Sequence, residues 1–267
     1  MIDWYQAIVL ALVQGLTEFL PVSSSAHLLL PSLLLGWVDQ GLAFDVAVHV
    51  GTLSAVLLYY RADLVRMAGR WLHSLVGAPA SDDSRMVWYL GLATVPAGLA
   101  GLYGGDFIED NLRTLPVIAT TTLVFGVLLG IADRRVRRGV SERPLGLAVA
   151  LIVGVSQALA LVPGVSRSGI TMTAALFLGM GRQASARFSF LLSIPIIASA
   201  GLLKVLELIS TEASVDWFIM GLGVVVSGVS AYLCIAAFIR LLDRVGFMPF
   251  VYYRIGLAAL LYLIWLL

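Results

Sequence analysis

The sequence predicts an all-α, polytopic integral membrane protein built as an inverted-topology internal repeat. Three observations lead to this prediction: an apolar composition, apolar runs along the whole chain, and a polar motif that occurs twice. Of the 267 residues, 60% are hydrophobic and 12% are charged, and the mean hydropathy is +0.97. Soluble domains are roughly half apolar and a quarter charged. The net charge of +1 argues against a nucleic-acid partner, and the single cysteine, Cys234, excludes an internal disulfide.

Long apolar runs recur along the chain, and each approaches or exceeds the length needed to cross a hydrocarbon layer of ~30 Å. They cover residues 44–60, 86–104, 115–132, 188–206, 215–239 and 249–267. We therefore expect about six full transmembrane spans and, with the shorter helices described below, about ten helices in one membrane domain.

A polar motif near the N-terminus, QGLTEFLPVSSSAH, is echoed in the second half of the chain. At a constant spacing of 143 residues, the matching pairs are Gln14 and Gln157, Ser23 and Ser166, Ser25 and Ser168, Leu35 and Leu178, and Gly36 and Gly179. The alternative is a coincidence of residues common in membrane proteins, but the ordered series with two motif serines favours a duplication. We expect a first repeat over residues 1–139 and a second over residues 140–267.

Each repeat is expected to begin with a pair of helices too short to span the membrane. Residues 24–36, for example, reach only about 20 Å at 1.5 Å per residue. Pro21 and Pro163 are expected to end the preceding helices, and the serines that follow suit N-caps. We predict two re-entrant hairpins with tips at membrane depth, 4–36 (helices 4–20 and 24–36) and 145–180 (helices 145–162 and 166–180). Three spans follow each hairpin, and this odd number inverts the second repeat.

The basic residues predict the orientation of the chain. When the loops are assigned alternately to two sides, 14 of the 17 lysines and arginines fall on one side, which is then cytoplasmic. They are Arg61, Arg66, Arg70, Arg85, Arg134, Arg135, Arg137, Arg138, Arg143, Arg182, Arg187, Arg240, Arg244 and Arg254. Both termini are then extracytoplasmic, and the first hairpin enters from outside while the second enters from the cytoplasm.

The hairpin tips, FLPVSSSAH and LVPGVSRSG, are expected to meet near the midplane. Two helix N-termini that face one spot form an anion site through free N–H groups and helix dipoles. Arg167 adds a planar guanidinium suited to bidentate phosphate binding, and the small Gly164 and Gly169 let the backbone approach a ligand. The alternative is that Arg167 only pairs with Glu18 and so holds the hairpins together.

The remaining polar side chains are of the types that phosphoryl chemistry needs. Gln14 and Glu18 share one face of a helix, and Ser24 and His27 share a face of the next, so hydroxyl, imidazole and carboxylate are expected to converge. His27 is a candidate base for attack by Ser24 on phosphorus. Glu18 could instead be the base, orient His27 or hold a divalent cation. His49, alone within a span, is interpreted as a packing residue.

The stretches QGLTEFLPVSSSAH and PGVSRSGITM resemble the two signature motifs of the undecaprenyl-pyrophosphate phosphatase family, bacterial proteins linked to bacitracin resistance. FSFLLSIP at 188–195 and PFVYYR at 249–254 also resemble stretches of that family, so the resemblance covers essentially the whole chain. It implies a multi-pass phosphatase of the bacterial cytoplasmic (inner) membrane that uses Mg²⁺ or Ca²⁺. It further implies hydrolysis of undecaprenyl pyrophosphate to the monophosphate and inorganic phosphate, which recycles the lipid carrier of peptidoglycan synthesis.

The resemblance also implies roles for residues at matching positions. Catalytic roles are expected for Glu18, Ser24, His27 and Arg167. Substrate-binding roles are expected for Gln14, Ser23, Ser25, Gly164, Ser166, Ser168, Gly169 and Thr171, and a metal site for Glu18 and Gln14. One departure matters, because the family often has Glu where this chain has Gln14, and an amide cannot act as a general base. Glu18 is then the sole acid of the motif.

Two other functional classes fit parts of the pattern. A membrane transporter or flippase for a prenyl phosphate or another anion also uses inverted repeats whose broken helices meet at the midplane. It needs no nucleophile and base, so the spacing of Ser24 and His27 favours an enzyme. A scaffold that binds anionic lipid through the arginines of 134–143 is weaker, because topology already accounts for them. The expected partners are a polyprenyl pyrophosphate and the bilayer, with a homodimer left open, and the site is expected to face the extracytoplasmic side.

Overall fold

The computed structural model describes residues 2–38, 40–137, 144–210 and 216–267, and the regular structure in these ranges is helical. The helices are α1 (Trp4–Thr17), α2 (Ser24–Leu35), α3 (Gly41–Tyr59), α4 (Arg61–Leu75), α5 (Asp82–Leu112), α6 (Leu115–Arg137), α7 (Leu147–Ala158), the 3₁₀ turn η1 (Leu159–Leu161), α8 (Arg167–Phe177), α9 (Arg182–Ser210), α10 (Trp217–Val245) and α11 (Met248–Leu266). The expected boundary between the repeats, at 139 and 140, lies outside the described residues, as do Arg138 and Arg143.

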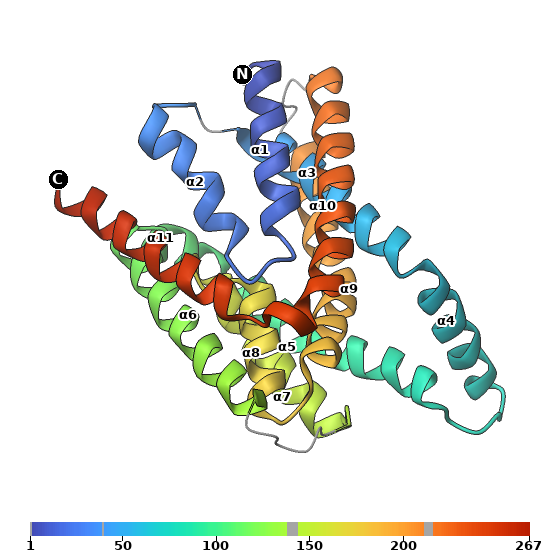
Figure 1. Ribbon diagram of the computed structural model, residues 1–267. Coiled ribbons are helices and arrows are strands. Elements are labelled where there is room, and N and C mark those ends of the chain that lie inside the picture. The colour runs from blue at the N-terminus through green and yellow to red at the C-terminus, as the bar shows by residue number, and fades with distance from the viewer. Residues whose placement is uncertain (1, 39, 138–143, 211–215) are drawn as a thin grey trace.

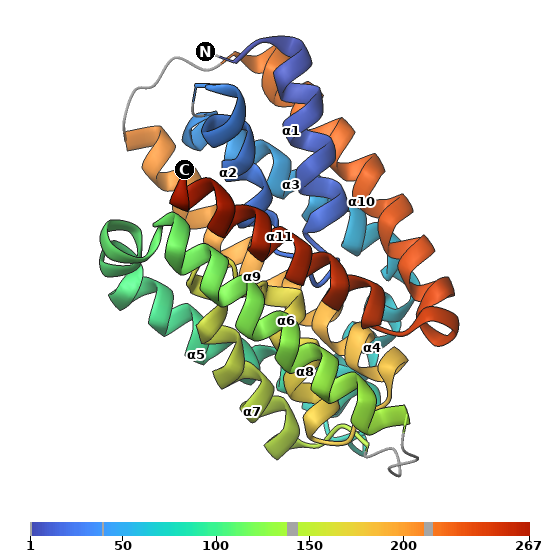
Figure 2. The same cartoon turned by 60° about the vertical axis from the view of Figure 1, so that its left-hand side comes forward.

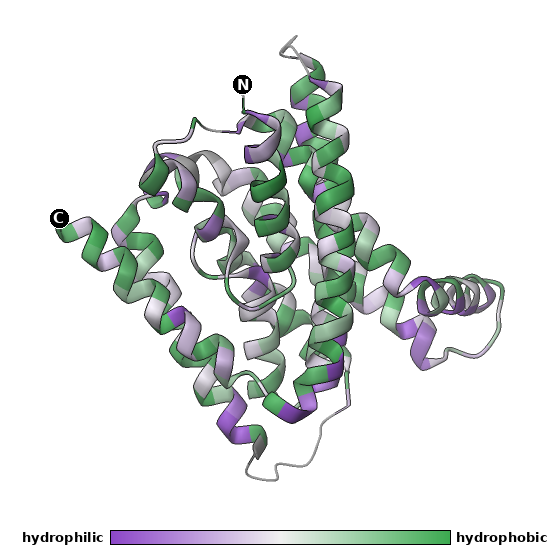
Figure 3. Cartoon of the chain, turned by 45° about the horizontal axis from the view of Figure 1, so that its top comes forward, coloured by the Kyte–Doolittle hydropathy of each residue, from purple (hydrophilic) through white to green (hydrophobic). Residues whose placement is uncertain are grey.

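Six of the described helices are long and apolar enough to cross a membrane, namely α3, α5, α6, α9, α10 and α11. Their outer faces carry large exposed apolar side chains, such as Leu99 of α5 and Leu233 of α10. Figure 3 shows hydrophobic residues over the long helices and hydrophilic residues mainly near helix ends and the centre. Such an apolar exterior suits lipid rather than water. The prediction of an all-α, multi-pass membrane protein with six spans is confirmed.

Helix α4 is missing from the sequence-based prediction, which treated its arginines as loop charges. Its apolar residues alternate with charged ones, so no run reaches the length of a span, but Met67 is buried on one face while Arg70 is exposed on another. Arg66 Nε donates to Asp83 Oδ2 of α5 at 2.9 Å. Figure 1 shows α4 and the start of α5 extending away from the bundle. The described residues therefore contain eleven α-helices where about ten were expected.

Two short helix pairs, α1–α2 and α7–α8, run from opposite ends of the bundle toward its centre (Figures 1 and 2). Helix α1 ends at Thr17 and helix α7 at Ala158, several residues before Pro21 and Pro163. The expected ends at 20 and 162 were too late. Proline disfavours helical geometry in the residue before it, which accounts for Leu20 and Val162 alone. The chain between helix and proline forms a turn at the first tip and η1 at the second.

Each short pair packs against a long helix from the other half of the chain. Helix α1 lies along α10, and helix α7 lies along α5. Small residues allow this close approach: a Cβ on Gly15 would meet Ser227 O at 2.6 Å, and one on Gly154 would collide with Ala93 O. Helices in lipid associate through such van der Waals contacts because apolar side chains gain little by leaving the membrane. The two halves are therefore interlocked, and the hairpin tips are held at the centre.

The location of Arg254 differs from the sequence-based prediction, which placed it among the charges of the cytoplasmic loops. It lies on α11, is 0% exposed and is the largest fully buried side chain among the described residues. The loop assignment was wrong here because α11 begins at Met248 and so includes Arg254 in its second turn.

Candidate active site

Each hairpin tip contains a serine in a left-handed backbone conformation. Ser23, which precedes α2, has a φ of 75°, and Ser166, which precedes α8, has a φ of 73°. They stand at matching positions of the duplicated motif, and no other described non-glycine residue has a positive φ. Such conformations cost of order 1–3 kcal/mol each and cluster at functional sites. The surrounding contacts must therefore hold both turns in place.

The two tips contact each other directly. Ser168 Oγ donates a hydrogen bond to Leu20 O at 2.8 Å, and Arg167 Nη2 lies 2.9 Å from Glu18 Oε1. The side chains of Arg167 and Glu18 are only 13% and 9% exposed. Arg167 Nη1 also donates to Ser189 O of α9 at 3.1 Å. The tips therefore meet as expected, and the ion pair between Arg167 and Glu18 is present.

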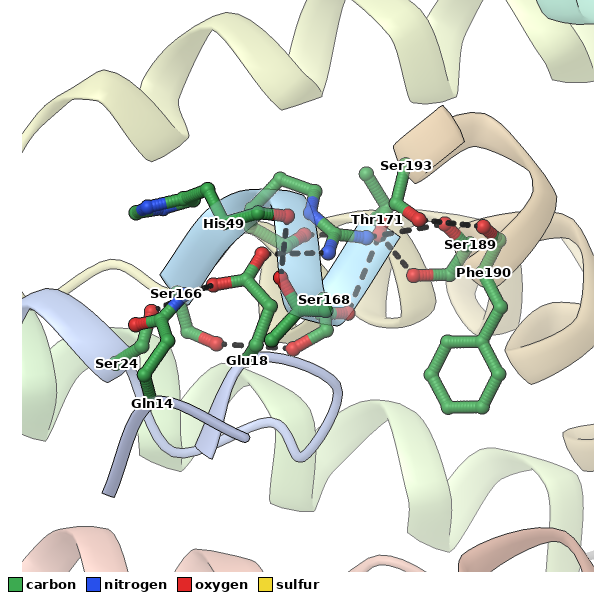
Figure 4. A network of polar contacts seen from close by, with 12 residues as sticks. Gln14, Glu18, Ser24, His49, Ser166, Ser168, Thr171, Ser189, Phe190 and Ser193 are labelled. Carbon is green, nitrogen blue, oxygen red and sulfur yellow. Dashed lines mark hydrogen bonds and ion pairs between the residues drawn. The ribbon is translucent and has the colours of Figure 1, made fainter. Parts of the chain in front are cut away.

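The second oxygen of Glu18 accepts hydrogen bonds from polar side chains of the first hairpin. Glu18 Oε2 accepts hydrogen bonds from Ser24 Oγ at 2.8 Å and from Gln14 Nε2 at 3.0 Å (Figure 4). Ser23 Oγ and Ser25 Oγ lie 3.1 Å apart in the same turn. One carboxylate thus connects a potential nucleophile, a guanidinium and an amide.

A cavity of about 140 Å³ opens beside this network. Its lining includes Gln14, Ser24 and Ser25 from the first hairpin and Pro163 from the second tip. The remaining lining residues are Leu28, Leu29, Ser32, Gln40, Asp45, His49 and Arg113. The cavity therefore places a serine hydroxyl and the amide bonded to Glu18 in a space of about the size of a few phosphate groups or water molecules.

His27 does not face the Ser24 hydroxyl in this structure. Its Nδ1 lies 2.6 Å from Ser23 O, and because a carbonyl only accepts, Nδ1 carries the proton. The other nitrogen, Nε2, lies 2.6 Å from the Tyr253 hydroxyl of α11, and the two rings stack. In a neutral imidazole both nitrogens are thus engaged. The expected convergence of hydroxyl and carboxylate occurs, but the imidazole of His27 is turned away, and its catalytic role stays a prediction.

His49 supplies an imidazole to the cavity wall, contrary to its interpretation as a packing residue. Its Nδ1 donates to Asp45 O at 2.7 Å, which places Nε2 on the far side of the ring from its own helix. Figure 4 shows His49 beside the cluster that contains Gln14, Glu18 and Ser24. The signal that sequence reasoning missed is the pair of ionisable residues, Asp45 and His49, four apart inside an apolar span.

The second tip is tightly built around its serines. Ser166 Oγ accepts from Gly169 N at 3.1 Å and lies 3.3 Å from Ser168 Oγ. Thr171, expected to bind substrate, is fully buried, and its Oγ1 lies 2.7 Å from Ser189 Oγ. It therefore supports α8 from behind rather than lining the cavity.

The two glycines of the second tip make room for protein atoms. A Cβ on Gly164, whose φ is 89°, would collide with Thr121 Oγ1 and approach Ile118 O at 2.6 Å. A Cβ on Gly169 would lie 2.9 Å from Arg254 Nη1. Both were expected to give a ligand access to the backbone, but the space beside them is filled by α6 and by Arg254.

Gln14 offers an unused oxygen next to Glu18. Its Oε1 is buried and has no hydrogen-bond partner among the described residues. No described group of three or more His, Cys, Asp or Glu side chains is arranged to hold a metal ion. Gln14 Oε1 is a carbonyl-type oxygen, which suits a hard cation such as Mg²⁺ that takes most of its ligands from phosphate and water.

Comparison with known proteins places the chain in a family. The bacitracin resistance protein BacA family matches residues 7–260. An undecaprenyl-diphosphatase of Alcanivorax borkumensis is 59% identical and covers 99% of both chains. The undecaprenyl-diphosphatases of Hahella chejuensis and Teredinibacter turnerae are 58% and 55% identical over 98% of this chain and 98% and 99% of their own. On this evidence the chain belongs to the bacitracin resistance protein BacA family.

Proposed function

We propose that this protein is an undecaprenyl-diphosphatase, which hydrolyses undecaprenyl pyrophosphate to undecaprenyl phosphate and inorganic phosphate. The relatives that bear this name match it over nearly the full length of both chains. The structural observation that carries the proposal is the network in which Glu18 bonds to both Ser24 and Arg167. A nucleophile, a base and a phosphate-binding cation are the groups that phosphoryl transfer requires.

Substrate binding begins with the guanidinium of Arg167. It pairs with Glu18 through Nη2 alone, and a phosphate can bind the same guanidinium with two oxygens. We propose that the terminal phosphate of the substrate replaces Glu18 as the partner of Arg167 and also accepts hydrogen bonds from the N–H groups at the start of α2 and α8. The isoprenoid tail stays in lipid. This exchange releases Glu18 Oε1 and leaves Oε2 on the Ser24 hydroxyl.

Ser24 Oγ then attacks the terminal phosphorus, and its proton passes to Glu18 Oε2. The Oγ–P bond forms as the bond from that phosphorus to the bridging oxygen breaks, and undecaprenyl phosphate leaves with the electron pair. Water next attacks the phosphoserine, and Glu18 returns its proton to Ser24 Oγ as inorganic phosphate departs. In the direct alternative Ser24 positions the attacking water. The hydrogen bond of 2.8 Å supports Glu18 as the base for the covalent route.

A divalent cation fits beside this site. We propose that Glu18 and Gln14 Oε1 would hold the expected Mg²⁺ or Ca²⁺ together with phosphate oxygens, and the unpaired Gln14 Oε1 supports this proposal. When bound, such an ion neutralises charge on the phosphate oxygens. The Gln14 amide cannot take a proton, which leaves proton transfer to Glu18 and to the imidazoles.

The inverted repeat and the orientation complete the proposal. The opposed helix pairs and the similar positive φ angles of Ser23 and Ser166 support two inverted repeats with re-entrant hairpins. The cavity is lined by the start of α3 and the end of α5, at the end of the bundle that carries the N-terminus of α1. With the arginine-rich ends in the cytoplasm, this end faces the extracytoplasmic side of the inner membrane.

Phosphate release by the purified protein in detergent tests the proposal. The substrate is undecaprenyl pyrophosphate, assayed with Mg²⁺ and with EDTA, and the matched variant is Ser24→Ala. Release by the wild type that is lost in the variant would support it. A folded wild type that binds the lipid but releases no phosphate would contradict it and favour the transporter alternative, which no observation favours at present.

A further inference from the structure

We propose that Arg254 is a positioning residue of the active site, which locks the two hairpin tips in the geometry that presents Ser24 and Arg167 to phosphate. This inference rests on the proposed function, because the effect it predicts is on phosphate release. The observation behind it is a guanidinium at the centre of the protein whose five N–H groups all point at backbone carbonyls.

Three of these hydrogen bonds go to the two tips. Nη1 of Arg254 donates to Pro21 O of the first tip at 3.2 Å and to Val165 O of the second tip at 3.1 Å. Nη2 donates to Gly164 O of the second tip at 2.9 Å. A single nitrogen, Nη1, thus bridges the hairpins, which come from opposite ends of the bundle.

The other two hydrogen bonds anchor the side chain to a transmembrane helix. Nε donates to Thr122 O at 3.1 Å and Nη2 to Thr121 O at 3.4 Å, both on α6. Gly126, one turn further along α6, makes room for the side chain, since a Cβ there would lie 3.0 Å from Arg254 Cβ. Arg254, which belongs to α11, therefore fixes the positions of both tips relative to the packed helices α6 and α11.

The tip carbonyls that accept hydrogen bonds from Arg254 lie next to Ser23 and Ser166, the two serines with a positive φ. Pro21 is two residues before Ser23, and Val165 directly precedes Ser166. Irregular backbone inside a membrane protein needs partners for its carbonyls, since neither lipid nor helix supplies them. Ser24 and Arg167 each directly follow one of these two serines. Their positions therefore depend on the hydrogen bonds that the Arg254 guanidinium makes.

The charge of Arg254 is part of the arrangement. Its side chain is 0% exposed, and its hydrogen-bond partners among the described residues are carbonyls rather than carboxylates. An uncompensated buried cation is costly, and it is retained where it meets carbonyl dipoles or an anionic ligand. Because the guanidinium is fully buried and bonded to both tips, Arg254 acts through the tips, and it adds a fixed positive charge behind the phosphate site.

The test compares Arg254 with Arg182, whose side chain is 15% exposed. Arg254→Lys keeps the charge but offers at most three donors and no planar fork. The matched control is Arg182→Lys, at the buried ion pair that Arg182 makes with Asp133 at 2.6 Å, which belongs to neither tip. For both variants we measure melting temperature in detergent, kcat and KM for undecaprenyl pyrophosphate per folded molecule, and the inhibition constant of inorganic phosphate.

We expect Arg254→Lys to lower kcat about 100-fold, as displacement of reacting groups by about 1 Å does, and to weaken inhibition by phosphate. Arg182→Lys should lower the melting temperature while kcat stays within about twofold of wild type. Equal kcat in the two variants would overturn the inference. Wild-type protein that releases no phosphate would defeat the proposed function and this inference together, whereas an active wild type with a fully active Arg254→Lys defeats this inference alone.

Gly169→Ala provides a second route if Arg254→Lys does not fold. Its Cβ would lie 2.9 Å from Arg254 Nη1 and 3.0 Å from Ser166 Cβ, so it would displace the guanidinium without removing it from the protein. The control is Gly201→Ala on α9, where a Cβ meets nothing within 4 Å. We expect kcat to fall at least about tenfold in the first variant and to be unchanged in the second. Unchanged kcat in Gly169→Ala would overturn the inference.

Discussion

Ser24 Oγ donates its hydrogen bond to Glu18 Oε2 at 2.8 Å, while the ring nitrogens of His27 bind Ser23 O and the Tyr253 hydroxyl. The proton of the candidate nucleophile is therefore already directed at a carboxylate. This relationship favours Glu18 over His27 as the proposed acceptor of the first proton, a choice that the sequence left open. The proposed roles of the individual side chains can be tested separately by mutation.

The first prediction concerns the Ser24 hydroxyl. Ser24→Ala should lower kcat by about 1,000-fold or more if Ser24 is the nucleophile, because no other group replaces the attacking oxygen. The measurement is phosphate release together with a search for a phosphorylated serine in wild-type protein quenched with acid. The control is Ser25→Ala, which removes the neighbouring hydroxyl that bonds to Ser23 rather than to Glu18. A Ser24→Ala enzyme that keeps most of its activity would exclude the covalent route.

The second prediction concerns the fork of Arg167. Arg167→Lys should lower kcat/KM by about 10²–10³-fold, because a point charge cannot hold two phosphate oxygens as the guanidinium does. Arg187→Lys on α9 is the matched control, since Arg187 pairs with Asp63 outside the cavity. Near-normal turnover in Arg167→Lys would show that the pair with Glu18 is structural.

The third prediction separates the two imidazoles. His49→Gln should lower kcat about 100-fold if His49, which lines the cavity, carries a proton during the reaction. His73→Gln, on the exposed face of α4, should have no effect. Full activity in His49→Gln combined with loss in His27→Gln would instead assign the proton to His27 and require its ring to leave Tyr253 during turnover.

The fourth prediction concerns stability at the second tip. Gly164→Ala should destabilise the protein by about 1–3 kcal/mol, because an alanine is strained at a φ of 89° and its Cβ would collide with Thr121 Oγ1. Gly98→Ala on α5, where a Cβ meets nothing within 4 Å, should not destabilise it. Unfolding in detergent measures both variants, and equal stability would contradict the close approach of the tip to α6.

The fifth prediction concerns pH and Asp63 on α4. Partial burial raises the pKa of Asp63, but hydrogen bonds and charge from Arg66 and Arg187 outweigh this and hold the pKa below its ordinary value. A lowered pKa in the folded protein stabilises it above the ordinary pKa of the carboxyl, and the contribution is lost as pH falls through the folded value.

The matching measurement is the melting temperature of Asp63→Asn against wild type. The wild type should melt higher at pH 7, and the difference should shrink as the pH drops below about 4. Asp82→Asn, at a more exposed ion pair with Arg85, should change the melting temperature little at any pH. A difference for Asp63→Asn that persists unchanged at low pH would contradict the role of its charge.

The six spans could be predicted because lipid imposes a minimum length and an apolar composition on each crossing helix. The short helix pairs followed from the same rule, since 24–36 is too short to span, and α2 ends at Leu35. Helix α4 was missed because Arg61, Arg66 and Arg70 break its apolar run, and only the surface of its neighbours shows which face is buried.

Within the site, the proximity of Gln14, Glu18 and Ser24 could be predicted because they lie within eleven residues of one another, from the end of α1 to the start of α2. Arg167 followed from the duplication of the motif. His49, Tyr253 and Arg254 could not be predicted, because their roles depend on how α3 and α11 pack against the tips. The hydrogen bond from Arg254 to Pro21 O, for example, joins residues 233 positions apart, a contact that no local spacing encodes.

That last contact also bears on how the protein is made. A membrane protein enters the bilayer from its N-terminus onward, so the first hairpin is in place well before α11 has been synthesised. Until then Pro21 O lacks the donor that Arg254 provides, and the first tip has no fixed partner. A chain that stalls or is cut before its last helix therefore contains every residue of the first hairpin and still has no assembled site. From the proposed role of Arg254 we expect incomplete copies to be inactive toward the lipid, so that activity marks molecules whose insertion has finished.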